Sequence, residues 1–340
     1  MTQLAIYSFE KCLEIASKTG GNNHLMLGNG FSVSLFPKIF NYKALADKIT
    51  SPSIKSLFTS LYTNDFEYVM RKLTDALVIA KLYPEGDKLG LRIKKDLDQL
   101  KNTLIDVITR SHPANPQAIT EAQYNSCYNF LKNFEGGKKY TFNYDLILYW
   151  TYMHFLDHET TPLRHNDGFR HPKHDQTVVT WSIGRENNQS VYYLHGAMHI
   201  FSDRSETEKY TWINSGKCIA DQVREAIDHQ KYPVFISEGT TNHKLLRIRE
   251  NSYLGRGFAS LKSIRGNLFI FGHSLRDDDN HVFDLLNGES KVKNIFVSLF
   301  GDIKNENNQK IISKVELWRA QYRNKKYHFY SAESANVWAI

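Results

Sequence analysis

Residues 138–145, with the sequence KKYTFNYD, carry the pattern from which the fold of this chain is predicted. The YTF segment consists of residue types that favour β-strands. Asn143 and Asp145 follow it, and the apolar run LILYW at 146–150 comes next. Because Asn or Asp directly before an apolar run signals a helix N-terminus, the stretch predicts a short strand that runs straight into a helix.

Other stretches of the chain repeat this pattern, in which an apolar strand is followed at once by small or polar residues. They are residues 25–30 (LMLGNG), 192–196 (YYLHG) and 268–274 (LFIFGHS). Further strands are expected at 232–237, 294–299 and 327–330. Strands that alternate with helices form parallel sheets. The sequence therefore predicts an α/β fold, Rossmann-like and doubly wound around a mainly parallel sheet.

The segment 41–135 differs from the rest of the chain. Its apolar residues recur at helical spacing, and no convincing strand interrupts them. A crossover between parallel strands needs only about a dozen residues. We therefore expect one domain over residues 1–340 with a large helical insertion, 41–135, between the first two strands.

The segment 157–190 is polar and contains four histidines: His158, His165, His171 and His174. Clustered histidines allow a metal site, but their spacing matches neither a helical HxxxH pair nor a zinc finger. A loop of this length in a compact domain is often a lid or an interaction element. We expect a polar loop or lid here and no metal.

Composition narrows the function classes. Lys and Arg number 43 against 36 Asp and Glu, a net charge of +7. A nucleic-acid surface needs basic residues on one face with aromatic residues among them. The basic segments 244–256 and 321–326 carry no such motif, so a nucleic-acid partner is not expected. The chain has three isolated cysteines, no secretory signal and no apolar run of roughly 18–20 residues, so we expect a cytoplasmic protein without a membrane span.

The four strand ends are expected to meet at one edge of the sheet, because ligands bind at the carboxyl ends of parallel strands. In this reading Gly28 and Gly30 adopt positive φ and bring N–H groups to a phosphate. Asn143 and Asp145 supply an amide and a carboxylate for ribose hydroxyls, and His195 supplies a proton acceptor.

Each of these residues also has a purely structural explanation. The glycines can form a tight strand-to-helix turn with nothing bound. Asn143 can cap a helix, and Asp145 can stabilise the first turn through the helix dipole. His195 can be a hydrogen-bonded core histidine, and the acidic run 277–279 can be a solvated helix start.

The four motifs, GNGFS at 28–32, TFNYD at 141–145, HG at 195–196 and GHSLRDD at 272–278, resemble the SIR2 family when taken in this order. The similarity is greater to the bacterial SIR2-like group, and within it to DUF4917-type proteins. Sirtuin deacylases carry two CxxC pairs for zinc, which this chain lacks. The resemblance therefore implies the NAD-cleaving branch, which is associated with anti-phage defence.

That branch implies an NAD+ glycohydrolase that releases nicotinamide and ADP-ribose and needs no cofactor besides its substrate NAD+. Asn143 would position the nicotinamide ribose or the attacking water, His195 would be the general base, and Asp145 would orient groups on the ribose side. The resemblance assigns NAD+ binding to a further set: Gly28, Asn29, Gly30, Phe31, Ser32, Thr141, Phe142, Gly196, Gly272, His273, Ser274 and Asp278.

A second function stays open, in which the pocket reads NAD or ADP-ribose without turnover and the chain acts as a regulatory subunit. An unregulated NADase would be toxic to its own cell. We therefore expect control by a regulatory protein partner or by homo-oligomerisation, acting through the insertion, the polar loop or the basic segment 241–256.

Overall fold

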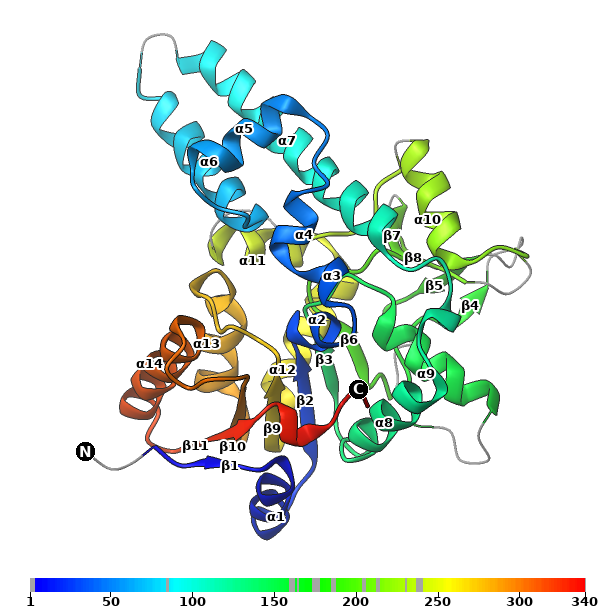
Figure 1. Cartoon of the computed structure of the whole chain (residues 1–340), viewed down its shortest axis with the longest axis vertical. Coiled ribbons are helices and arrows are strands. Elements are labelled where there is room, and N and C mark those ends of the chain that lie inside the picture. Colours follow the sequence, from blue (N-terminus) through cyan, green and yellow to red (C-terminus); the bar gives the residue numbers. More distant parts are fainter. Residues whose placement is uncertain are drawn as a thin grey trace.

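A computed structural model gives the structure of the chain (Figure 1). It describes residues 4–83, 86–158, 163, 165–172, 178–184, 188–203, 206–211, 215–229, 231–236 and 241–339.

A seven-stranded sheet forms the centre of the molecule, and every pairing between its strands is parallel. Its strands lie in the order β1, β11, β10, β9, β2, β3, β6. Their bounds are β1 (Ile6–Tyr7), β2 (Asn23–Leu27), β3 (Lys139–Thr141), β6 (Val191–Tyr193), β9 (Arg265–Phe271), β10 (Lys291–Leu299) and β11 (Lys326–Ser331). The predicted α/β fold with a mainly parallel sheet is confirmed.

The strand order has a switch point between β2 and β9. From β2 the chain continues to β3 and β6 on one side, and from β9 it continues to β10 and β11 on the other. In open α/β sheets a crevice forms at such a point, outside the carboxyl ends of the strands.

Helices cover both faces of the sheet. Successive strand residues point to opposite sides, so an apolar strand presents apolar side chains to both faces. Leu25 and Leu27 of β2 belong to one buried cluster and Met26 to the other. The first cluster includes residues of α1 (Phe9–Thr19), α8 (Glu121–Lys132) and α9 (Ile147–His158). The second includes residues of α12 (Ser252–Ser263), α13 (Asn280–Glu289) and α14 (Glu306–Gln321).

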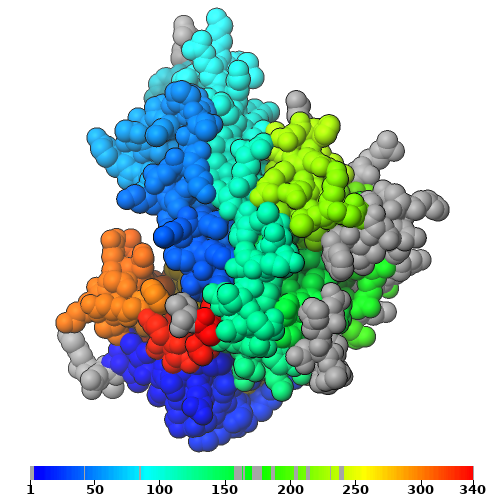
Figure 2. Space-filling view, turned by 45° about the vertical axis from the view of Figure 1, so that its right-hand side comes forward, coloured from blue at the N-terminus to red at the C-terminus, as the bar shows by residue number. Residues whose placement is uncertain are grey.

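The helical insertion rises above the carboxyl edge of the sheet as a separate arm (Figures 1 and 2). It consists of α4 (Tyr42–Ala46), α5 (Pro52–Ser60), α6 (Phe66–Ala80) and α7 (Gly86–Ser111). These helices share their own apolar cluster, from Leu45 to Ile108. Helix α8 also falls within the predicted insertion 41–135. It packs on the main core instead, since Phe130 contacts Phe9 and Phe271. The remaining helices are α2 (Gly30–Leu35), α3 (Pro37–Phe40), η1 (Pro116–Ala118), α10 (Ile219–Asp228), α11 (Thr241–Glu250), η2 (Asp277–Asp279) and η3 (Glu333–Ala335).

A second, antiparallel sheet was missed in the sequence. Its strands lie in the order β4, β5, β8, β7, with bounds β4 (His171–Pro172), β5 (Val178–Trp181), β8 (Glu206–Tyr210) and β7 (Ile200–Asp203). The prediction of a polar loop over 157–190 is therefore wrong where β4 and β5 lie. These strands are short, and β5 pairs with β8, which lies more than twenty residues further along the chain. The local sequence therefore does not predict them.

Two further predictions change in this region. His165 is not a loop side chain at the surface but lies beside the buried Asp167, with 4.0 Å between Nε2 and Oδ2. His174 lies outside the described residues. The strand expected at 232–237 is wrong within 232–236, where Phe235 makes only an isolated bridge to Gly196, and Ser237 is outside the described part. None of the described helices is long and apolar enough to cross a membrane.

Candidate functional site

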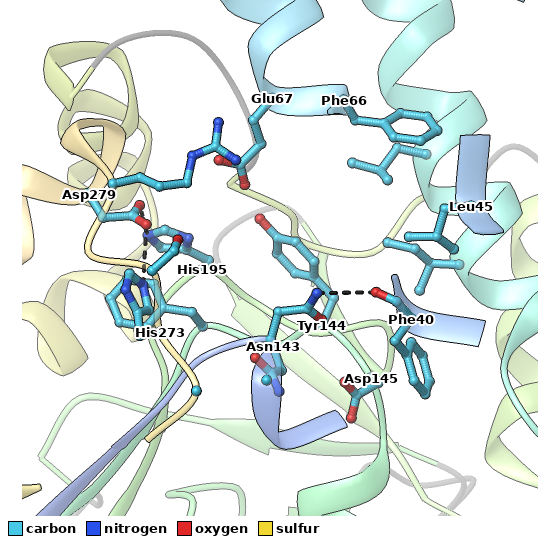
Figure 3. Close-up of a pocket in the computed structure, with 18 residues that line it drawn as sticks. Phe40, Leu45, Phe66, Glu67, Asn143, Tyr144, Asp145, His195, His273 and Asp279 are labelled. Atoms are coloured by element: carbon cyan, nitrogen blue, oxygen red, sulfur yellow. Dashed lines mark hydrogen bonds and ion pairs between the residues drawn. The ribbon is translucent and has the colours of Figure 1, made fainter. Parts of the chain in front are cut away.

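A cavity of about 270 Å³ lies at the carboxyl ends of β2, β3, β6 and β9, beneath the insertion. One side of it is polar and carries His195, His273 and Asp279, and the opposite side is apolar and carries Phe40, Leu45 and Phe66 (Figure 3). The complete lining is Asn29, Gly30, Phe40, Leu45, Phe66, Glu67, Leu104, Ile108, Phe142, Asn143, Tyr144, Asp145, His195, Gly272, His273, Ser274, Arg276 and Asp279.

Half of the residues to which the resemblance assigns NAD+ binding line this cavity: Asn29, Gly30, Phe142, Gly272, His273 and Ser274. The others do not line it: Gly28, Phe31, Ser32, Thr141, Gly196 and Asp278. Several of these support the lining from behind. The Thr141 hydroxyl accepts the backbone N–H of Asn143 at 3.0 Å, and the Phe31 ring packs on Trp338 at 5.0 Å.

The side chain of Asn143 is held in one orientation. Its Nδ2 donates to Ser32 Oγ at 2.8 Å, and that hydroxyl donates to Asp145 Oδ2 at 2.5 Å. The other amide atom, Asn143 Oδ1, is buried and has no hydrogen-bond partner among the described residues. A buried carbonyl oxygen without a partner is costly. This oxygen is therefore an acceptor that the described part of the chain leaves unused.

Asp145 acts on its neighbours through both carboxylate oxygens. Oδ2 accepts the Ser32 hydroxyl, and Oδ1 accepts the backbone N–H of Ile147 at 2.9 Å, at the start of α9. Burial raises the pKa of this carboxyl group, while the Ser32 hydrogen bond lowers it. With both oxygens engaged, Asp145 positions Ser32 and the helix start, and the role expected for it in orienting ribose-side groups is not visible in these contacts.

The glycine turn differs from its prediction. Neither Gly28 nor Gly30 has positive φ, so that expectation is wrong. A Cβ on Gly30 would lie 2.6 Å from Gly272 Cα, so glycine is required here because two loops pack backbone to backbone. The Gly28 N–H donates to Phe271 O and the Gly30 N–H to Gly272 O, at 2.9 and 2.8 Å. Both donors are thus occupied within the protein rather than free for a phosphate.

His195 lies at the end of β6, buried among aromatic and charged groups. Its Nε2 is 3.4 Å from His281 Nε2 and 3.7 Å from Asp279 Oδ1. Its ring meets the edge of the Phe142 ring, with 4.8 Å between centroids. Burial holds the pKa of His195 well below its usual range, against the opposing effect of Asp279. The ring is therefore neutral near pH 7, the form that can accept a proton.

Sequence reasoning missed a buried charge cluster at the polar side of the cavity. Lys244 is fully buried, with Nζ 3.2 Å from Glu67 Oε2 and 3.0 Å from Asp279 Oδ1. Burial disfavours the charge of Lys244, but the carboxylates of Glu67 and Asp279 outweigh it and raise its pKa. Lys244 was expected in a basic surface segment, and that expectation is wrong for this residue, because helix α11 turns it inward.

Further ion pairs tie the insertion to the body beside the cavity. Arg71 of α6 contacts Asp278 at 2.8 Å, and Arg276 contacts Asp65 at 2.5 Å. Asp278, expected on the adenosine side of a bound NAD+, is thus engaged by Arg71, and also by Arg276 at 3.4 Å. The acidic run 277–279 is not a solvated helix start, since Asp278 and Asp279 are buried.

The fold and the cavity define a Rossmann-like α/β protein with a cavity at the switch point of its parallel sheet, where ligands bind in open α/β sheets. The family model described as "Domain of unknown function (DUF4917)" matches residues 25–338. The chain belongs to this family. No curated protein matches the chain in sequence.

Proposed function

We propose that this chain hydrolyses NAD+ to nicotinamide and ADP-ribose. The observation that carries the proposal is Asn143, which lines the cavity together with His195 and whose buried Oδ1 has no hydrogen-bond partner among the described residues. The choice of NAD+ as the substrate rests on the order of the four strand-end motifs, which resembles that in SIR2-like proteins of the NAD-cleaving branch.

The reaction breaks the bond between C1′ of the ribose and the nicotinamide nitrogen. The bonding electrons leave with nicotinamide, and C1′ develops oxocarbenium character. Asn143 Oδ1 accepts a hydrogen bond from a ribose hydroxyl or from the attacking water, which fixes the water against C1′. Neutral His195 accepts the proton that the water loses, and ADP-ribose and a proton are the other products.

The size of the cavity supports control of this activity. Pockets for drug-sized ligands measure roughly 300–1,000 Å³, more than the about 270 Å³ seen here. The cavity thus lies near the lower end of this range. In the proposed function the insertion, which ion pairs join to the body beside the cavity, moves when NAD+ binds. A cytoplasmic anti-phage effector that depletes NAD+ on a signal from a protein partner or from homo-oligomerisation fits such a device.

The test is the release of nicotinamide from NAD+ by the purified full-length chain, followed by HPLC. We expect Asn143→Ala to lower the rate about 10²–10³-fold, as loss of a positioned polar group does. We expect His195→Ala to lower it about 10²–10⁴-fold, the usual contribution of a general base. The matched controls are Asn125→Ala and His229→Ala, which change the same residue types at exposed positions and leave the rate unchanged.

The second candidate is a regulatory subunit that binds NAD or ADP-ribose without turnover. The contacts of Asp145 favour it, because both carboxylate oxygens are engaged within the protein rather than with a ribose. Tight binding of NAD+ with no nicotinamide release, in the presence of every activating partner tested, would establish this function and exclude the hydrolase.

A further inference from the structure

Three buried side chains on the polar side of the cavity bring ligand atoms together. They come from three elements: His195 from the end of β6, Asp279 from η2, and His281 from the first turn of α13. His195 Nε2 lies 3.4 Å from His281 Nε2 and 3.7 Å from Asp279 Oδ1. The three ligand atoms all lie within 4.8 Å of one another, and no second group of this kind occurs in the described part of the chain.

These separations fit a tetrahedral metal ion. Zinc binds imidazole nitrogen and carboxylate oxygen at roughly 2.0–2.2 Å, which makes the edge between two ligands about 3.4 Å. Two of the three separations, 3.4 and 3.7 Å, are close to this edge, and the third is at most 4.8 Å. The ligand types also select the metal, because imidazole suits zinc and its neighbours whereas Mg²⁺ and Ca²⁺ prefer oxygen.

The two histidines face each other through their Nε2 atoms. Without an ion, the two facing Nε2 atoms share one hydrogen bond between them. An ion would take a lone pair from each ring in its place.

The surroundings of Asp279 orient its carboxylate and also limit the affinity. Oδ2 lies 3.3 Å from His273 Nε2, and Oδ1 lies 3.0 Å from Lys244 Nζ. Hydrogen bonds and ion pairs of this kind fix the orientation of a carboxylate that binds a metal ion. The ammonium of Lys244 repels a cation, so binding is exchangeable rather than structural. His195 and Asp279 line the cavity and His281 does not, so the group lies at the wall of the cavity.

We propose that His195, Asp279 and His281 form a site for a divalent transition-metal ion of the zinc type. The second half of the proposal rests on the proposed hydrolase function: an ion on His195 Nε2 occupies the lone pair that the ring, once released from His281, uses to accept the proton of water. Bound zinc therefore holds the enzyme inactive, and removal of zinc activates it.

The binding test uses full-length protein dialysed against a chelator and then titrated with Zn²⁺ alone, against a chromophoric competitor. We expect one ion per chain. His281→Gln should weaken binding more than about 100-fold, since even loss of a contact behind a ligand costs about 10–100-fold. His229→Gln, at an exposed histidine, is the matched control and should bind zinc as the wild type does.

Thermal melting shows whether a variant that binds no zinc is still folded. Zinc should raise the melting temperature of the wild type and of His229→Gln, because a ligand that binds only the folded state stabilises it. It should not raise that of His281→Gln, whose own melting curve shows whether it is folded. No zinc binding by the wild type, or equal binding by a folded His281→Gln, overturns the site.

The two proposals fail separately. If zinc binds at this site but the chelated protein never releases nicotinamide, the hydrolase function fails and the metal site stands. If the chelated protein releases nicotinamide and zinc bound at the site leaves the rate unchanged, the inhibitory role is overturned while the hydrolase stands.

Discussion

The side-chain amide of Asn143 donates a 2.8 Å hydrogen bond to the hydroxyl of Ser32, which donates in turn to the carboxylate of Asp145. The hydroxyl of a residue 111 positions away thus fixes the orientation of the amide. Without the Ser32 hydroxyl the amide group could rotate and exchange the positions of its NH₂ and Oδ1. The catalytic contribution proposed for Asn143 therefore depends on Ser32.

Removal of this hydroxyl should lower activity through Asn143. We expect Ser32→Ala to reduce nicotinamide release at least about tenfold, because small errors in positioning are costly in catalysis. It should also cost about 1–3 kcal/mol of stability, since buried polar groups lose a partner. Ser34→Ala is the control, because the Ser34 hydroxyl contacts only a carbonyl of its own turn.

A double variant separates positioning from a general loss of stability. If Ser32 acts through Asn143, then Ser32→Ala with Asn143→Ala should be no slower than Asn143→Ala alone. Rates that multiply independently would contradict this role, and HPLC kinetics on the three variants decide between the two.

The ion pair between Arg71 and Asp278 should hold the insertion closed. The Asp278 side chain is 5% exposed and that of Arg71 is 31% exposed, so solvent screens the pair only in part. We expect a double-mutant cycle with Arg71→Ala and Asp278→Ala to give a coupling of about 1–2 kcal/mol. We also expect Arg71→Ala to speed hydrogen exchange in α6 and, for the hydrolase, to raise nicotinamide release.

Arg110 offers the comparison for this pair. It also lies in the insertion and contacts Asp106 and Asp228, but its side chain is 54% exposed. Arg110→Ala should change stability by less than about 0.5 kcal/mol. Equal exchange rates in α6 for both variants and the wild type would show that Arg71 does not restrain the insertion.

The predictable part of this structure is the part encoded locally. The strands β2, β3, β6 and β9, whose ends line the cavity, are apolar runs that end in small or polar residues. This pattern can be read from neighbouring residues alone. Asn143 and His195 were found in this way. Parallel strands bring their ends to one edge, so the meeting of these two residues at one cavity also followed.

The missed part depends on contacts between distant segments. Lys244 pairs with Glu67, 177 positions away, and with Asp279, 35 positions away. In the sequence Lys244 and Asp279 lie in polar segments, and Glu67 lies in an amphipathic helix. All three resemble solvated positions, because a lone charged residue does not reveal a buried counter-charge. The strands of the antiparallel sheet were missed for the same reason, since β5 is recognised only through its pairing with β8.

The contact between Gly30 and Gly272 gives a prediction about stability. A Cβ on Gly30 would lie 2.6 Å from Gly272 Cα, a backbone atom that cannot move aside alone. We expect Gly30→Ala to destabilise the protein by about 1–3 kcal/mol, the usual cost of overpacking. Gly288, in α13, has nothing within 4 Å of the corresponding position. Gly288→Ala should therefore stabilise by about 0.5–1 kcal/mol, and urea unfolding of both variants checks the pair.

His112 makes the stability of the protein depend on pH. It follows α7, and its Nε2 accepts the backbone N–H of Leu146 at 3.0 Å, so this nitrogen carries no proton. Its Nδ1–H donates to the Pro113 carbonyl at 2.9 Å. Burial lowers the pKa of His112 to about 4, because a proton on Nε2 would be desolvated and would break the bond to Leu146.

The sign of the effect follows from the two pKa values. The unfolded chain takes up the proton near the ordinary value of about 6.5, and the folded chain does so only near pH 4. Between these values the unfolded state binds more protons, so the stabilisation is complete above pH 6.5 and is lost as the pH falls towards 4. At about 1.4 kcal/mol per unit, the loss is at most about 3.5 kcal/mol.

Urea unfolding at several pH values between 7 and 4 measures this dependence. His112→Asn keeps a donor and an acceptor but cannot titrate, so its free energy of unfolding should fall less steeply over this range than that of the wild type. His24, whose pKa burial also lowers to about 4, contributes its own slope and remains in both proteins, so the difference belongs to His112. His229→Asn, at an exposed histidine, should retain the wild-type slope. If the free energy of unfolding depends on pH equally in His112→Asn and the wild type, protonation of His112 does not contribute to the pH dependence of stability.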